Sequence, residues 1–324
     1  MEQVAPKEEN NVKPFMTDMP IVANTPNASE GKMMDSPMEK ARRIFHIENR
    51  TVVNCLSEFY GTMLLLFLGI SIVHQFDLSH KQLNTWIQIN LGWGFTIMFC
   101  VYTCSKTSGG HLNPAISLMF YTIGKLPLAH VFYYIIAQVL GAFVGTALAY
   151  TVYLDQTFHV LGNARIVAGP NGTASLFTSM PAPHLSNTIA FWDQFVGTGF
   201  LALFACVIID KRNEIPSYMH ALLFGLLVAM IGMAFGMNLG YPINPARDFA
   251  PRVFAALIGY GWEVFSYHNY YFWIPILAPC FGAIAAAWSY FIFVGFQIPD
   301  QPPNYMKENK SDADGIPLKT TDLS

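Results

Sequence analysis

Six long apolar stretches constrain this chain more than any other feature, because each can cross the hydrocarbon core of a bilayer. That core is about 30 Å thick, and a helix needs roughly 20 residues to span it. The composition agrees: 53% of the 324 residues are hydrophobic and only 12% are charged, which favours several membrane spans over a soluble core. The predicted spans are residues 52–76, 86–106, 127–153, 190–210, 219–238 and 270–295.

The two ends of the chain differ from its middle. Residues 1–50 and 297–324 are polar and show little periodic hydrophobicity, so we expect two disordered tails on either side of a membrane domain at 51–296. An even number of spans places both tails on one side of the membrane. Lys and Arg gather in the tails and in the connections on that side, so both termini are predicted to be cytosolic.

This orientation sorts the N-glycosylation sequons. Those at Asn27, Asn49 and Asn309 fall on the cytosolic side, whereas Asn171 lies in the long outward loop 154–189. Asn171 is therefore the candidate glycosylation site. The five cysteines all fall within predicted spans and match no disulfide or metal-ligand pattern, so we interpret them as small apolar packing residues. No metal or cofactor is expected.

The membrane domain repeats itself, with halves at 51–153 and 190–296. Each half contains three spans, so the second half must enter the membrane from the opposite side, which gives an inverted repeat. Three pairs of segments match in the same order: SEFYGTMLLLFL (57–68) with DQFVGTGFLALF (193–204), GGHLNPAIS (109–117) with GYPINPARD (240–248), and YYIIAQVLGAFVGTALAY (133–150) with FWIPILAPCFGAIAAAWSY (272–290).

An Asn-Pro-Ala motif opens a short apolar helical pattern in each half. These patterns are too short to span a bilayer but long enough for half a crossing, at about 1.5 Å per residue. Asn is a favoured N-cap, and Pro fits the first helical position. One such motif alone is an ordinary helix cap, but two at equivalent positions predict half-helices whose N-termini meet near the middle of the membrane. The motifs are Asn113, Pro114, Ala115 and Asn244, Pro245, Ala246.

Six spans, two half-helices and paired Asn-Pro-Ala motifs resemble the aquaporin family of major intrinsic proteins, over residues of about 50 to 296. Asp248 after the arginine in NPARD, together with RDFAPR and WIPILAP, is similar to its glycerol-conducting branch, the aquaglyceroporins. The resemblance implies an all-α membrane protein with six transmembrane helices and two re-entrant half-helices. It also implies a homotetramer with one pore per subunit.

In that branch the pore narrows at a filter of aromatic residues and an arginine, and the matching positions are Trp93, Gly232, Tyr241 and Arg247. The two rings could face the carbon edge of glycerol, and the arginine could donate to two of its hydroxyls. The resemblance implies that strict water channels usually carry histidine at the Gly232 position. We therefore expect the missing side chain to leave room for a wider solute. An arginine in the first turn of a helix opposes the helix dipole, so selectivity against cations, not stability, explains it.

The two asparagines are expected to complete the filter. If each side-chain oxygen caps its helix, the NH2 groups of Asn113 and Asn244 point into the pore as donors. A passing water would accept from both, which breaks a proton wire, and the two helix N-termini oppose cations. The non-helical residues before each motif are predicted to present backbone carbonyls as an acceptor track: Gly109, Gly110, His111, Gly240 and Pro242. We interpret His111 as pore lining rather than as a pH sensor.

Four polar residues are expected to support these loops. An intramembrane Glu58 is functional by default, but the resemblance implies that it braces the loop before the first half-helix. Its repeat partner is Gln194, preceded by Asp193, so the second brace is expected to be neutral or shifted by one residue. Gln138 is expected to hydrogen-bond loop backbone, and Asp248 to help hold its loop.

These observations predict a passive channel in the plasma membrane for glycerol, water and other small neutral solutes such as urea, which excludes ions and protons. A strict water channel is the nearest alternative, and Gly232 with Asp248 argues against it. A secondary transporter also uses inverted repeats and broken helices, but the spans offer few carboxylates for a coupling ion. A membrane enzyme needs converging nucleophile, base or metal ligands, and the sequence suggests none.

Overall fold

The computed structural model describes residues 36–299, which form helices and no strand. The chain divides into two compact units after His46. The first contains α1 (Pro37–Phe45), which begins at Ser36, where the hydroxyl accepts from the Glu39 amide at 3.2 Å. The prediction of a tail without regular structure is therefore wrong for Pro37–Phe45. Residues 1–35 and 300–324 of the predicted tails lie outside the described part of the chain.

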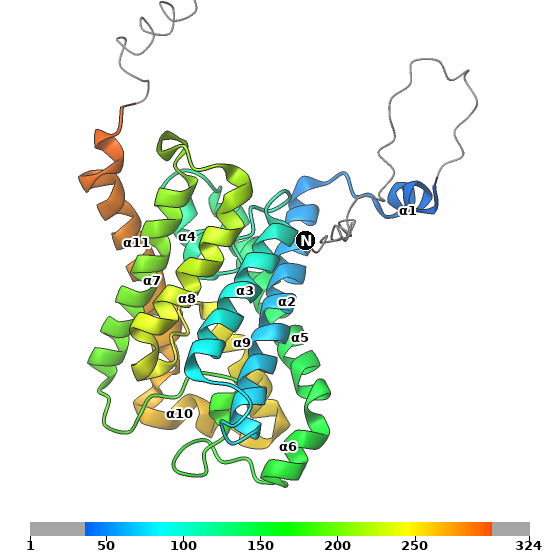
Figure 1. Ribbon diagram of the computed structural model, residues 1–324, viewed down its shortest axis with the longest axis vertical. Coiled ribbons are helices and arrows are strands. Elements are labelled where there is room, and N and C mark those ends of the chain that lie inside the picture. Colours follow the sequence, from blue (N-terminus) through cyan, green and yellow to red (C-terminus); the bar gives the residue numbers. More distant parts are fainter. Residues whose placement is uncertain (1–35, 300–324) are drawn as a thin grey trace, which may run out of the picture. The chain divides into compact units, whose positions relative to one another are not determined.

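The second unit contains six spans long and apolar enough to cross a membrane, and the ends of its six long helices agree with the predicted spans to within a few residues. Residues 270–273 differ most, since they precede the last long helix instead of belonging to it. These helices run side by side in Figure 1: α2 (Arg50–Leu78), α3 (Trp86–Cys104), α5 (Leu128–Val152), α7 (Asn187–Ile209), α8 (His220–Leu239) and α11 (Ile274–Phe293).

Two short helices lie among the long ones. The first, α4 (Pro114–Thr122), occupies the upper half of the bundle in Figure 1, and α9 (Pro245–Ala255) the lower half. Asn113 caps α4 through a 2.9 Å bond from the Ala115 amide, and Asn244 caps α9 through bonds from Ala246 (3.0 Å) and Arg247 (3.3 Å). Each half-helix begins where the motif predicted.

Helix packing follows the inverted repeat. In the first repeat α2 packs against α5, and in the second α7 packs against α11, while α3 and α8 join the two repeats. A Cβ at Gly141 would lie 2.2 Å from the Phe59 carbonyl oxygen, and one at the equivalent Gly282 would lie 2.0 Å from that of Phe195. Glycine therefore allows the same close backbone approach in both repeats, as small residues do in membrane helix interfaces.

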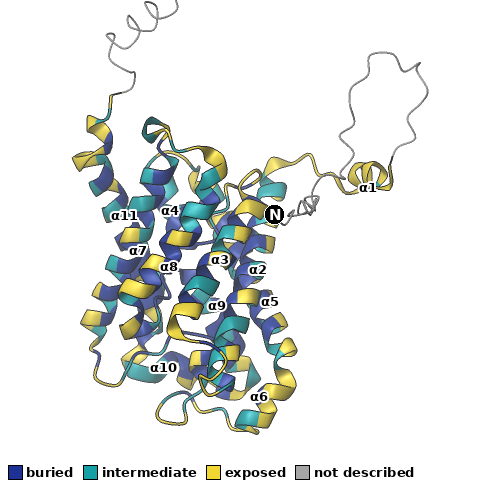
Figure 2. Ribbon diagram, in the orientation of Figure 1, coloured by how far each residue is buried: buried dark blue, intermediate teal, exposed yellow. Residues whose placement is uncertain are grey.

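Figure 2 shows exposed residues on the outer faces of the long helices of this unit and in the connections between them. Large apolar side chains are among them, including Phe99, Phe132, Ile136 and Phe281. An apolar outer face around a buried polar interior suits a lipid solvent. All five cysteines are free thiols, and three of them, Cys100, Cys104 and Cys206, are buried, in agreement with the packing role predicted for them.

The connection between the repeats has more structure than a simple loop. It contains α6 (Leu154–Leu161) and a short turn at Ala174–Leu176. Phe177, Thr178 and Ser179 follow this turn and are buried in the second unit. The connection from α9 to α11 contains α10 (Glu263–Tyr270). Both connections contribute to the site described next.

Candidate functional site

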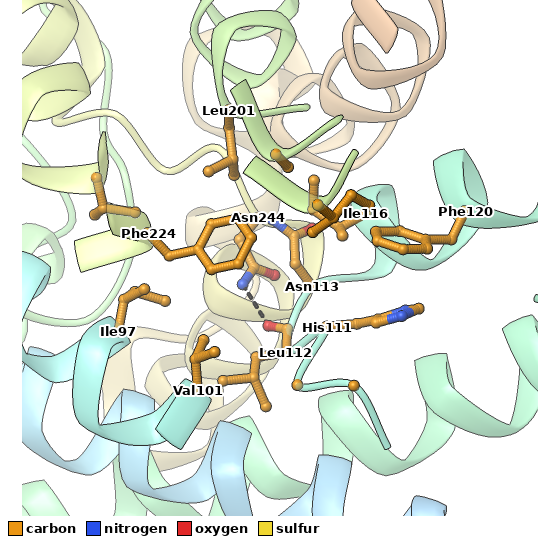
Figure 3. Close-up of a pocket in the computed structure, with 15 residues that line it drawn as sticks. Ile97, Val101, His111, Leu112, Asn113, Ile116, Phe120, Leu201, Phe224 and Asn244 are labelled. Carbon is orange, nitrogen blue, oxygen red and sulfur yellow. Dashed lines mark hydrogen bonds between the residues drawn. The ribbon is translucent and has the colours of Figure 1, made fainter. Parts of the chain in front are cut away.

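Two cavities meet at the N-termini of the half-helices. The first is lined by α3, α7, α8 and the loop before α4, and Figure 3 shows Ile97, Val101 and Phe224 opposite the loop that bears His111 and Leu112. The second is lined largely by the loop before α9, with Trp93 and Arg247. The two cavities adjoin at the residues that line both of them: Ile97, Asn113, Leu201, Val228 and Asn244.

The two asparagines link the repeats. The side-chain nitrogen of Asn113 donates to the Ile243 carbonyl at 2.9 Å, and that of Asn244 donates to the Leu112 carbonyl at 2.7 Å, the dashed line in Figure 3. The half-helices therefore abut head to head as predicted. The expectation that both NH2 groups point into the pore needs correction. Each amide donates one of its two N–H groups to a carbonyl of the opposite loop, so only one N–H is left for the pore.

The loops before the half-helices have matching backbone conformations. Leu112 and Ile243, the residues before each asparagine, have positive φ of 51° and 39°, and Tyr241 has 41°. Non-glycine residues rarely adopt this region, and such strain persists only where surrounding contacts hold it. The residues predicted to form the carbonyl track line the two cavities, Gly109, Gly110 and His111 in the first and Gly240 and Pro242 in the second.

Three of the four predicted filter residues line the second cavity: Trp93, Tyr241 and Arg247. The Arg247 guanidinium carbon lies 4.8 Å from the centre of the Trp93 ring, and its Nη1 donates to the Phe177 carbonyl at 3.4 Å. Phe177 comes from the connection between the repeats, and nothing in the sequence pattern pointed to it.

Gly232 does not leave open space. A Cβ at this position would lie 2.5 Å from Tyr241 Cζ and 2.5 Å from Asn90 Oδ1. The ring of Tyr241 occupies the volume that a larger side chain would need, so the predicted extra room for solute is wrong at Gly232 itself. The glycine acts by letting the aromatic ring pack against α8.

Residues 47–290 match the family model described as major intrinsic protein. The chain belongs to this family. It is 36% identical to aquaporin-9 of Mus musculus over 84% of this chain and 95% of the relative, and 35% identical to aquaporin-10 of Homo sapiens over 79% and 86%. The solved aquaglyceroporin from Plasmodium falciparum superposes with a TM-score of 0.67 at 32% identity, covering 75% of this chain and 96% of that one. The family resemblance and the aquaporin-like fold are thus confirmed.

In this major intrinsic protein Glu58 holds the first loop, as the resemblance implied. Its fully buried carboxylate accepts from the backbone amides of His111 (2.9 Å) and Leu112 (2.7 Å), from the Ser108 hydroxyl (2.6 Å) and from the Gln138 amide (2.8 Å). Four donors satisfy a carboxylate that burial would otherwise make very costly. One of the two braced amides belongs to Leu112, the residue with positive φ, and the other to the residue before it.

Gln138 acts differently from the prediction. Its Nε2 donates to Glu58 and to the Ser117 hydroxyl at 3.1 Å, so it contacts side chains instead of loop backbone. Ser117 also pairs with His111 Nδ1 at 3.1 Å, and the His111 ring lies 4.4 Å from that of Phe120. His111 is held in the cavity wall by these contacts.

Gln194 holds the second loop through a single backbone bond. Its Oε1 accepts from the Ile243 amide at 2.9 Å, while its Nε2 donates to Asp193 at 2.9 Å. Asp193 accepts a further bond from Asn238 at 2.8 Å. The second brace is therefore the neutral Gln194, and the carboxylate lies one residue earlier at Asp193. This arrangement agrees with the sequence prediction.

Asp248 holds a different segment from the one predicted. Its Oδ1 accepts from Arg252 Nε (3.0 Å) and Nη2 (2.7 Å), and its Oδ2 accepts from the amide and hydroxyl of Ser179. Arg252 also donates to the carbonyls of Ser179 (2.8 Å) and Val264 (2.7 Å). The pair is 0% and 1% exposed, so Asp248 fixes the connection that supplies Phe177. Arg252 was missed, although its spacing of four residues from Asp248 is a recognisable signal.

Asn171 is exposed, and the Thr173 hydroxyl of its sequon lies 2.7 Å from that of Tyr260. Its glycosylation stays a prediction.

Proposed function

We propose that this chain conducts glycerol, water and other small neutral solutes passively, and that it excludes ions and protons. The observation that carries this proposal is the composition of the second cavity. Trp93 and Tyr241 give it an aromatic wall, and Arg247 gives it forked hydrogen-bond donors. Glycerol has a carbon edge and a hydroxyl edge, so it matches such a wall on both sides.

Arg247 is well placed for this role. One of its nitrogens is bound to the Phe177 carbonyl, and its plane lies near the Trp93 ring. These contacts restrain the guanidinium, while its other N–H groups stay available for two solute hydroxyls. The Phe177 carbonyl is thereby a further part of the proposed filter.

Exclusion of ions would come from three positive features along the path. Arg247 lies in the second cavity, and the N-termini of α4 and α9 meet where the cavities adjoin. Each helix end carries about half a positive charge. The residues that line the two cavities include no carboxylate to offset them. The remaining N–H of Asn113 and of Asn244 would donate to a passing water and interrupt a proton wire.

We also propose the assembly and orientation that the sequence predicted. The distribution of Lys and Arg supports a cytosolic position for both termini, in a chain that would be inserted in the plasma membrane. Repeats at 51–153 and 190–296 would be joined by an extracellular connection at 154–189. The protein would form a homotetramer with a pore in each subunit and would need no cofactor or chemical step.

Stopped-flow light scattering on proteoliposomes tests this function. A sucrose gradient measures water flux, a glycerol gradient measures glycerol flux, and a pH-sensitive dye with a valinomycin-clamped potential measures proton flux. We expect rapid water and glycerol flux with no proton flux above that of empty liposomes. Water flux without glycerol flux would instead indicate a strict water channel, and glycerol flux that depends on an ion gradient would indicate a transporter.

The filter assignment needs a paired substitution. Gly232→His alone would collide with the Tyr241 ring, so we expect it to impair both fluxes. Gly232→His with Tyr241→Cys removes the ring and gives the histidine most of its volume, so that only the end of the Asn90 side chain has to shift. We expect this double variant to keep water flux and to lose most glycerol flux. Equal loss of both fluxes in the double variant would contradict the assignment.

A further inference from the structure

The Tyr241 ring packs into a smooth slot between α3 and α8. Gly232 and Gly236 form one side, since a Cβ on Gly236 would lie 3.1 Å from Tyr241 Cδ1. Trp86 meets the ring edge-on, with centroids 6.2 Å apart and planes at 86°. The two glycines have no side chains that could interlock with the Tyr241 ring. Packing alone therefore does little to stop the ring from sliding along the surface of α8.

Asn90 lies beside Gly232, next to the Tyr241 ring. It is on α3, one turn before Trp93, and is fully buried. Neither its Oδ1 nor its Nδ2 contacts a partner among the described residues, and the buried Tyr241 hydroxyl has none either. Buried polar groups are nearly always hydrogen-bonded, because an unpaired one costs about 1 to 3 kcal/mol.

The two groups face the same space. Asn90 Oδ1 and Tyr241 Cζ each lie 2.5 Å from the point where a Gly232 Cβ would be. They are therefore at most about 5 Å apart, and the hydroxyl extends from that ring carbon. The structure has no direct hydrogen bond between the two groups, and a single water, which reaches about 2.8 Å to each partner, can span a separation of this size.

We propose that a water molecule bridges the Tyr241 hydroxyl and the Asn90 amide, and that Asn90 is a positioning residue for the filter. The water accepts from the hydroxyl and donates to Asn90 Oδ1. The bridge fixes the ring along the glycine slot and so sets the width of the second cavity. The consequence for selectivity rests on the proposed glycerol channel, whereas the water site itself does not.

A double-mutant cycle tests the coupling in proteoliposomes. Asn90→Leu and Tyr241→Phe each remove one end of the bridge at nearly constant volume. We expect each to lower the ratio of glycerol to erythritol permeability by roughly two- to tenfold, the range that one net hydrogen bond spans. The double variant should lose no more than the stronger single variant. Independent effects that multiply would overturn the proposal, as would an unchanged ratio in both single variants.

Thr62→Val is the matched control. Thr62 is also fully buried and its hydroxyl also has no partner among the described residues, but it lies on α2 one turn after Glu58. We expect it to leave the permeability ratio unchanged. A fall as large as that of Asn90→Leu would mean that any buried polar group affects the ratio, and it would overturn the specific role of Asn90.

High-resolution crystallography of the full chain tests the water directly. We expect density within hydrogen-bond distance of both the Asn90 amide and the Tyr241 hydroxyl, and its loss in Tyr241→Phe. No density there, or a direct bond between the side chains, would overturn the bridge. This measurement does not depend on transport: density at this site without glycerol flux would defeat the proposed function and leave the water site standing.

Discussion

The two loops that precede the half-helices reach one backbone geometry by different chemistry. Each ends in a residue with positive φ, Leu112 or Ile243, followed by an asparagine that caps its helix and donates to the other loop. Glu58 holds two amides of the first loop, whereas Gln194 holds one amide of the second. Backbone symmetry thus builds the path, and it does not require symmetric side chains.

The asymmetry continues into the half-helices. Ile116 and Arg247 occupy equivalent positions in the repeats, and each lines its own cavity. Ser117 is equivalent to Asp248, which pairs with Arg252. The first loop therefore combines a carboxylate brace with an apolar lining, and the second combines a neutral brace with a charged lining. This difference explains how an inverted repeat can concentrate selectivity at one end of the path.

The largest effect is expected from Asp248→Asn, which removes the negative charge of the buried ion pair on the second half-helix. It would leave Arg252 buried without a counter-ion, and removing one partner of a buried pair costs about 3 to 5 kcal/mol. We expect a strongly lowered unfolding temperature in detergent and loss of the ordered connection that contains Phe177. Ser117→Ala at the equivalent position should cost only about 1 kcal/mol. Equal losses in the two variants would contradict the asymmetry proposed here.

Glu58→Gln is expected to have the next largest effect. The new NH2 group cannot accept from the loop, so one of the two braced amides would be left unpaired at a cost of about 2 to 3 kcal/mol. The first loop should then become mobile, and water flux should fall together with thermal stability. Gln194→Leu also leaves one loop amide unpaired, that of Ile243, and removes a donor from Asp193, so we expect a loss of similar size. Unchanged stability in Gln194→Leu would mean that the second loop does not depend on its brace.

Gln194→Glu tests directly whether the two braces are interchangeable, because it introduces a carboxylate at the position equivalent to Glu58. Alone it should destabilise the protein by about 1 to 2 kcal/mol, since Asp193 loses a donor and gains a like charge. Adding Asp193→Asn should restore stability, because an asparagine can again donate. Thermal unfolding of the two variants side by side measures this, and a double variant no more stable than the single one would contradict the explanation.

Much of the fold followed from the sequence because lipid imposes simple rules. Span length, the repeat and the Asn-Pro-Ala caps are local or periodic patterns, and they placed the six long helices and both half-helices. The cavity lining also followed, since residues next to a cap at a half-helix N-terminus must lie on the path. Glu58 was assigned correctly by resemblance to a family with the same brace.

The errors lie where long-range packing decides. Phe177 reaches Arg247 from a connection with no periodic pattern, and no local rule predicts which of its residues become buried. The Tyr241 ring fills the volume beside Gly232, which depends on the distance between α3 and α8. Each asparagine amide bonds to the opposite loop, and that choice needs both loops in place. Such contacts depend on tertiary geometry and leave no mark in the local sequence.

The smallest expected effect concerns the ends of the first helix in each repeat. His74 and Asp210 are equivalent positions, and His74 Nδ1 donates one local hydrogen bond, to the Ile70 carbonyl at 2.9 Å. Asp210 follows α7 and accepts from Arg212 Nε (2.9 Å) and Nη2 (2.7 Å) and from the Tyr290 hydroxyl (3.0 Å). Hydrogen bonds from Arg212 lower the pKa of Asp210 from 3.8 to about 2, against the opposing effect of burial.

A depressed carboxyl pKa stabilises the folded state fully above the unfolded value, and this contribution is lost as pH falls through the folded value. For Asp210 the window therefore runs from about pH 4 down to about pH 2. We expect the unfolding temperature of the wild type to fall more steeply across this window than that of Asp210→Asn, by the equivalent of about 1 to 2 kcal/mol. The measurement is thermal unfolding of both proteins in detergent at pH 5 and pH 2.5. Comparing the two proteins cancels the contribution of every other carboxyl, because both contain them. If the unfolding temperatures of the wild type and of Asp210→Asn fell in parallel with pH, Arg212 and Tyr290 would not favour the ionised form of the Asp210 carboxyl. Replacing histidine by aspartate at this helix end would then have no electrostatic consequence for stability.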